Sequence, residues 1–217
     1  MNKDFLQEAL NQDKLLKLNT KLWLAIKNNQ LQQAKDLLNQ GATLHQITGV
    51  PLRRYDLDEN TALHLAAKFG LLSLVKLLVE HKTEVDVTNR LKQTPLQWAA
   101  YYGHLDVVKY LISKSADINN IDVDGDPALT WAANKGQFEV VDYLIEQGAD
   151  PKKVSPFGNT ALHWVAIAGE VEMAKHLIEL GCDPMLENKQ GHTALDLAIE
   201  NAHPDMVKML TAYLNHS

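Results

Sequence analysis

The stretch "NTALHWVAIAG" at residues 159–169 recurs along the chain and decides how the chain folds. Sliding the sequence against itself by 33 residues aligns five such stretches without a gap. A repeat at a fixed period of this length is typical of arrays in which each unit buries its apolar face against the next. The five stretches are "NTALHLAAKFG" (60–70), "QTPLQWAAYYG" (93–103), "DPALTWAANKG" (126–136), "NTALHWVAIAG" (159–169) and "HTALDLAIENA" (192–202).

Each unit is expected to form two short helices. The first helix starts at a threonine N-cap, such as Thr160, and ends at a glycine, such as Gly169. The second helix carries apolar residues at positions i, i+3 and i+4. A weaker unit, "TKLWLAIKNNQLQQAKDLLNQGAT" (20–43), precedes the five at an offset of 41, so that the eight additional residues lie in a long loop over 44–60. The pattern therefore predicts six helix pairs in one stack.

The spacing and the "TALHxAAxxG…LL…GAD" signature resemble the ankyrin repeat family over about residues 20–214. The resemblance implies an all-α solenoid of stacked helix-turn-helix units, with β-hairpin-like loops along one edge and a concave face. We expect a single ankyrin-repeat domain over residues 1–217. Its expected parts are an N-terminal capping segment at 1–14 and repeats at about 15–55 with the long loop, 56–88, 89–121, 122–154, 155–187 and 188–217.

Composition narrows the class of protein. The 217 residues are 46% hydrophobic and 22% charged, which is typical of a folded domain with a substantial core. A formal net charge of −6 disfavours nucleic acid and anionic membranes as partners. The uncharged apolar stretches are about half the ~20 residues that a membrane span requires. The single cysteine excludes an internal disulfide and favours a reducing compartment, so we expect a cytoplasmic monomer that contacts no membrane.

Three aspartates at alternate positions, Asp122, Asp124 and Asp126, resemble the start of an EF-hand calcium loop. Such a loop needs glycine at its sixth position and glutamate at its twelfth, where this segment has Pro127 and Ala133. At the 33-residue period Asp122 aligns with other short polar residues that fix turns by bonding nearby backbone N–H groups. We therefore interpret the segment as a turn and expect no metal site.

Two departures from the repeat pattern predict local irregularities. The fourth unit has Pro127 where the others have the threonine cap, so we expect Asp126 to cap the helix with proline at the first helical position. Glu59 and Lys92 replace the glycine that the family prefers in the hairpin. Because positive φ is costly for residues with a side chain, these two loops are expected to be strained or reshaped.

The chain offers little chemistry for catalysis. His64 and His163 occupy the same slot of the repeat, where the family uses imidazole to bond the loop backbone between units. The sequence contains no HExxH, paired CxxC, phosphate loop or GxSxG elbow. Cys182 replaces the alanine of "GAD" and is expected to be a packed thiol. We expect no catalytic residue and no cofactor.

Trp98, Trp131 and Trp164 stand one period apart. We expect them to pack against the second helix of their own unit and form a ladder through the core. The alternative is an aromatic binding stripe.

The family most often binds partners at the hairpin tips and at the exposed ends of the first helices. Several of these positions are aromatic or apolar here, which suggests a protein interface, although Tyr101 and Tyr102 could instead only cover the adjacent helix. The candidate protein-binding residues are Phe69, Arg90, Leu91, Tyr101, Tyr102, Asn134, Lys135, Phe157 and Ile167.

These observations favour a non-catalytic scaffold that binds a protein partner through its concave face and hairpin tips. Ankyrin proteins of this kind act as adaptors, as inhibitors, or as effectors that intracellular bacteria deliver into the host cytosol. The alternatives are an enzyme or small-ligand binder that uses the concave groove, and a self-assembling structural protein.

Overall fold

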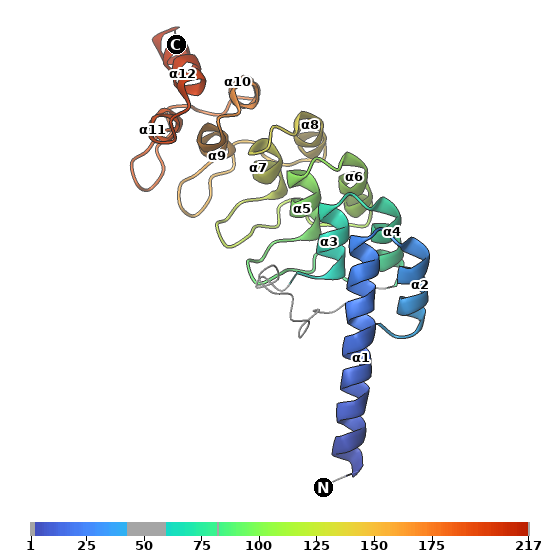
Figure 1. Cartoon of the computed structure of the whole chain (residues 1–217). Coiled ribbons are helices and arrows are strands. Elements are labelled where there is room, and N and C mark those ends of the chain that lie inside the picture. The colour runs from blue at the N-terminus through green and yellow to red at the C-terminus, as the bar shows by residue number, and fades with distance from the viewer. Residues whose placement is uncertain (1–2, 43–59, 82, 217) are drawn as a thin grey trace.

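The computed structural model describes residues 3–42, 60–81 and 83–216, and these form an elongated stack of paired helices (Figure 1). Within these residues there is no strand, which confirms the prediction of an all-α solenoid. The helices are α1 (Lys3–Lys27), α2 (Leu31–Asn39), α3 (Ala62–Lys68), α4 (Leu72–Glu80), α5 (Pro95–Tyr101), α6 (Leu105–Ser113), α7 (Ala128–Ala133), α8 (Phe138–Glu146), α9 (Ala161–Ala168), α10 (Val171–Glu179), α11 (Ala194–Glu200) and α12 (Pro204–His216).

Threonine caps start the first helix of four repeats. In α3 the Thr61 hydroxyl accepts a hydrogen bond from the backbone N–H of His64, while His64 Nδ1 accepts one from the backbone N–H of Thr61. This reciprocal pair satisfies two N–H groups that the helix end leaves without partners. The same arrangement recurs at α5, α9 and α11.

Helix α7 begins differently, and the prediction that Asp126 caps it is wrong. Pro127 is itself the N-cap, with φ −79° and ψ 173°, and no side chain caps the helix. Because the extended Pro127 stands between Asp126 and the first helical residue, Ala128, the Asp126 carboxyl lies one position too early to reach the free N–H groups. The Asp126 carboxyl group therefore does not cap α7.

A left-handed residue ends each first helix and reverses the chain. Gly70, Gly103, Gly136 and Gly169 have φ between +61° and +76°, which confirms the predicted glycine stops. Ala202, at the equivalent place in the last repeat, adopts φ +57° despite its side chain. The second helix of each repeat therefore runs back against the first.

Alanine and leucine build the core between these helices. Each first helix packs on the next, α3 on α5, α5 on α7, α7 on α9 and α9 on α11, through alanines such as Ala99 and Ala132 that are completely buried. The second helices contribute leucines such as Leu111 and Leu144 to the same layer. The small alanine side chains allow the close approach of neighbouring repeats.

The N-terminal helix is much longer than the other first helices. Leu22 and Ile26, near the end of α1, are buried and belong to the stack, whereas the start of the helix extends beyond α2 in Figure 1. The shielding role expected of residues 1–14 stays a prediction. Most of the long loop over 44–60, with Glu59, lies outside the described residues. Among the described helices none is both long and apolar enough to cross a membrane.

Candidate functional site

The loops along one edge of the stack have a hairpin-like turn fixed by a polar side chain. In the fourth repeat Asp122 Oδ1 accepts hydrogen bonds from the backbone N–H groups of Asp124, at 3.0 Å, and Asp126, at 2.9 Å. This geometry confirms the interpretation of the aspartate segment as a turn. Successive loops are also joined, because the backbone N–H of Val123 donates to the carbonyl oxygen of Leu91 at 3.0 Å.

Two histidines, His64 and His163, bond the loop backbone of the following repeat, as expected. His64 Nε2 lies 2.8 Å from the carbonyl oxygen of Gln93, and His163 Nε2 lies 3.3 Å from that of His192. Burial lowers the pKa of His64 to about 4, although the bond to Gln93 opposes the shift. The imidazole is therefore neutral at pH 7 and serves as a structural link.

The thiol of Cys182 is packed against the preceding repeat. It is buried and donates a hydrogen bond to the carbonyl oxygen of Pro151 at 3.3 Å. Burial raises the pKa of Cys182 to about 11, so that the reactive thiolate is scarce at pH 7. In the described part of the chain no three His, Cys, Asp or Glu side chains are grouped to hold a metal ion.

The prediction that the tryptophans form a ladder through the core is wrong. Trp98, Trp131 and Trp164 are half-buried and none belongs to the buried core cluster, although Trp98 packs against it. Trp98 Nε1–H donates to Gln93 Oε1 at 3.2 Å, and Trp131 Nε1–H donates to Asp122 Oδ2 at 3.0 Å. An indole N–H needs a polar partner when it is covered, and the loop side chains supply one on this side of the stack.

A side chain from the preceding repeat contacts each of these tryptophans. The contacting residue stands 30 positions earlier, near the end of the first helix. Lys68 Nζ lies 5.0 Å from the ring centroid of Trp98. The Tyr101 ring makes an edge contact with Trp131 at 5.4 Å between centroids, and Asn134 Nδ2 donates to the carbonyl oxygen of Trp164 at 3.2 Å. The helix ends and the tryptophan row therefore form one continuous surface.

Three of the candidate binding residues lie together on this surface. Phe69 and Tyr102 are 47% and 41% exposed, and Lys68 Nζ lies 5.9 Å and 5.5 Å from the centroids of their rings. Tyr101 is half-buried because its ring packs against Tyr102 and Trp131. Covering a neighbouring helix thus describes Tyr101 better than Tyr102.

The other candidate residues are spread along the loops and helix ends. Phe157 is 46% exposed in the loop of the fifth repeat. Lys135 Nζ lies 5.1 Å from the centroid of the Tyr101 ring. Their partner contacts stay predictions. The exposed members of this set are Arg90, Lys135 and Phe157, and the half-buried members are Leu91, Asn134 and Ile167.

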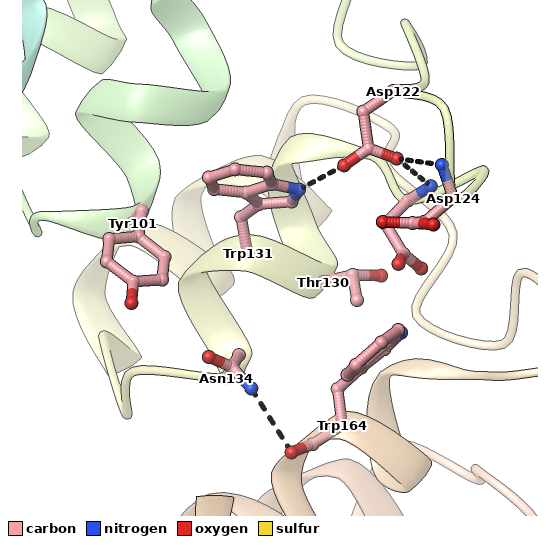
Figure 2. A pocket seen from close by; sticks show the side chains of 8 residues that line it. Tyr101, Asp122, Asp124, Thr130, Trp131, Asn134 and Trp164 are labelled. Carbon is pink, nitrogen blue, oxygen red and sulfur yellow. Dashed lines mark hydrogen bonds between the residues drawn. The ribbon is translucent and has the colours of Figure 1, made fainter. Parts of the chain in front are cut away.

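A pocket of about 190 Å³ opens between the fourth and fifth repeats, and the sequence did not predict it (Figure 2). It lies between the ends of the first helices and the aspartate loop. The rings of Trp131 and Trp164 flank Thr130, and Tyr101 lies beside Trp131 (Figure 2). We call it the acid–aromatic pocket, and its lining residues are Tyr101, Asp122, Asp124, Asp126, Thr130, Trp131, Asn134 and Trp164.

Carboxyl groups are concentrated in this pocket. Burial, followed by the charge of Asp122, raises the pKa of Asp126 to about 7. The indole of Trp164 opposes this shift, although among the described residues its buried N–H finds no hydrogen-bond partner of good geometry. Burial also raises the pKa of Asp122, whose hydrogen bonds to Trp131 and to the loop backbone favour its charged form. Asp126 is thus the carboxyl least compensated by its surroundings.

Comparisons with known proteins agree with the repeat architecture. A family model described as ankyrin repeats matches three times, over residues 22–122, 63–155 and 129–216. A stretch of 48 residues is 44% identical to the serine/threonine-protein kinase 12 of Arabidopsis thaliana, covering 22% of this chain and 10% of that protein. A match of this length spans about one and a half repeats, so it reports the shared repeat. With the family model covering nearly the whole stack, the chain belongs to the ankyrin repeat family.

Proposed function

We propose that this protein is a non-catalytic scaffold that binds a partner protein through its concave face and loop tips. Ankyrin repeats are generally protein–protein interaction modules. The observation that carries the proposal is the exposure of Phe69, Tyr102 and Phe157, each with over two fifths of its surface accessible, along the loop side of the stack. Aromatic side chains exposed in this way are typical anchors of protein interfaces.

Binding fits the pocket better than catalysis does. The Asp122 carboxylate accepts hydrogen bonds from the loop backbone and from Trp131. Among the residues that line the pocket, the remaining carboxyl groups are those of Asp124 and Asp126. Neither histidine nor cysteine is among the side chains that line it. A carboxylate pair without a nucleophile or a second type of base is better suited to recognising charge than to transferring groups.

Affinity capture from cell lysate tests the proposal. The wild-type chain is compared with a Phe69→Glu/Tyr102→Glu variant, in which Tyr101 is spared because its ring packs against Trp131. Phe138→Glu is the matched control, since Phe138 is 39% exposed but lies on α8, in the row of second helices. We expect a protein that is captured by the wild type and the control and is lost with the double variant.

Capture that is unchanged by the double variant would contradict the proposed face. The identity of the captured protein would also decide between an adaptor, an inhibitor and an effector delivered into a host. A solution mass that rises with concentration would instead favour the self-assembling alternative.

A further inference from the structure

The acid–aromatic pocket combines aromatic faces with carboxylates, and no cationic side chain lines it, although Lys135 Nζ lies 5.1 Å from the ring centroid of Tyr101. Its lining contains three aspartates and three aromatic rings, and none of the eight residues is lysine, arginine or histidine. Asp124 is exposed and both tryptophans are half-buried, so the pocket is open to solvent. An arriving ligand could therefore reach the rings and Asp124 directly, whereas Asp126, which is only 6% exposed, is reached from within the pocket.

The same chain shows what fills the equivalent place one repeat earlier. Beside Trp98 the preceding repeat supplies Lys68, whose ammonium group lies over the indole ring. The positions equivalent to Lys68 in the next two repeats are Tyr101 and Asn134, which are uncharged and contact Trp131 and Trp164 instead. The groove beside Trp98 thus accommodates a cation, whereas none of the residues that line the pocket is cationic.

The aspartate loop is also the most acidic of the described loops. The three alternate loop positions hold Asp122, Asp124 and Asp126 here, whereas they hold Asn89, Leu91 and Gln93 in the preceding repeat. Burial, followed by the charges of Asp122 and Asp124, raises the pKa of Asp126 to about 7. A cation in the pocket would relieve this repulsion, an anion would increase it, and a neutral group would only add to the desolvation.

We propose that the acid–aromatic pocket binds a lysine or arginine side chain that projects from the partner protein. The proposal rests on the proposed function, because the cation is presented by that partner. The rings of Trp131 and Trp164 contact the aliphatic stem and attract the charged head through their faces, while Asp124 and Asp126 accept its hydrogen bonds. Asp122 keeps the loop in shape through its bonds to the backbone and to Trp131.

The test is an NMR titration of the full chain that follows its indole N–H signals. The chain has four tryptophans, Trp23, Trp98, Trp131 and Trp164, so each pocket signal has an internal control. The probes are Nα-acetyl-lysine methylamide and Nα-acetyl-arginine methylamide, with the norleucine derivative as the uncharged control. We expect at least one cationic probe to shift the signals of Trp131 and Trp164 and to leave those of Trp23 and Trp98 in place. The cation that binds more tightly identifies the side chain.

Matched variants separate charge recognition from damage to the fold. In Asp124→Asn/Asp126→Asn we expect binding to weaken at least tenfold, while unchanged Trp23 and Trp98 signals report an intact stack. Trp164→Leu should also weaken binding, and it is a substitution that the fold accommodates, because Leu65 and Leu197 occupy the equivalent slots. Trp98→Leu is the control and should leave the affinity unchanged. The proposal is overturned if neither cation shifts the pocket signals, if norleucine shifts them equally, or if the double aspartate variant binds as well as the wild type.

The titration tests the pocket and the capture experiment tests the scaffold role, so either result can be negative without the other. A chain that captures a partner but shows no cation-dependent shift retains the proposed function and loses the pocket. A chain that shows the shift but captures nothing retains the pocket and loses the scaffold role.

Discussion

The groove beside Trp98 and the acid–aromatic pocket occupy equivalent places in successive repeats, yet they differ in charge. In the first, Lys68 lies over the indole and the loop carries Asn89 and Gln93. In the second, the uncharged Tyr101 stands at the position of Lys68, Asn134 stands there one repeat further on, and the loop carries aspartates. The helix pairs and the alanine core are the same in both, although Thr94 caps α5 and no side chain caps α7. The comparison shows that one scaffold can change its recognition chemistry through a few positions per repeat.

The largest expected effects concern what the two regions share. Leu96 and Leu129 are both about 1% exposed, and we expect Leu96→Ala and Leu129→Ala each to lower the free energy of unfolding by about 2 to 5 kcal/mol. Trp98→Leu and Trp164→Leu should each cost about 1 kcal/mol or less, because these rings are half-buried. Urea denaturation measures both pairs. If the Trp→Leu variants lose as much free energy of unfolding as the Leu→Ala variants, the tryptophans contribute to the core as the leucines do.

The pH dependence of stability should distinguish the pocket from the rest of the groove. Because the pKa of Asp126 rises from 3.8 to about 7 on folding, the folded chain holds a proton that the unfolded chain has lost between about pH 4 and pH 7. Stability from this group therefore falls as pH rises through that window, and the full penalty remains above it. We expect Asp126→Asn to stabilise the protein by about 1 to 3 kcal/mol at pH 8 and to have little effect at pH 4.

Thermal or urea unfolding at both pH values measures this effect. Asp205→Asn is the control, since Asp205 is exposed at the start of α12. A stabilisation by Asp126→Asn that is the same at pH 4 and pH 8 would contradict the raised pKa.

One substitution should give the pocket an internal cation, as Lys68 gives the groove beside Trp98. Asn134→Lys places an ammonium group at the position equivalent to Lys68, next to Trp164 and the aspartates. We expect affinity for the lysine derivative to fall about tenfold, a loss of about 1.4 kcal/mol, because an internal cation now competes for the same site. The titration of indole signals measures it. Glu200→Lys, at the equivalent position of the last repeat, should leave the affinity unchanged.

The smallest effect concerns the loops themselves. Lys92 adopts φ +58°, whereas the equivalent residue of the fourth loop is Gly125 at φ +83°. Lys92→Gly should stabilise the protein by about 0.5 to 1 kcal/mol, since glycine adopts positive φ without a steric penalty. Lys189→Gly in the loop of the sixth repeat should not, because the φ of Lys189 is not positive. Differential scanning calorimetry compares the two, and a destabilised Lys92→Gly would show that the lysine is not strained.

Much of the fold follows from the sequence because the period, the threonine caps and the glycine stops are local signals. Thr61 and Gly70, for example, bound α3 as the pattern predicts. The cap of α7 could not be predicted in the same way, because a proline at Pro127 fits either the N-cap or the first helical position. Small shifts of this kind decide where a neighbouring carboxyl group points.

The site was less predictable than the fold. A spacing of 33 residues places Trp98, Trp131 and Trp164 on the same side of their helices without saying which side faces the core. The pocket depends on contacts between residues about 30 positions apart, such as Asn134 and Trp164, and on the burial of Asp126. The available signal was the coincidence of an acidic loop with the tryptophan row.

The pKa of the Asp126 carboxyl group tests the central claim most directly, since it reports whether the pocket holds a charge that lacks a counter-ion. It can be followed through the ¹³C chemical shift of the carboxyl carbon during a pH titration of the wild type and of Asn134→Lys. The account predicts a pKa of about 7 in the wild type and a lower value in the variant. A wild-type value near 3.8 that the variant leaves unchanged would contradict it.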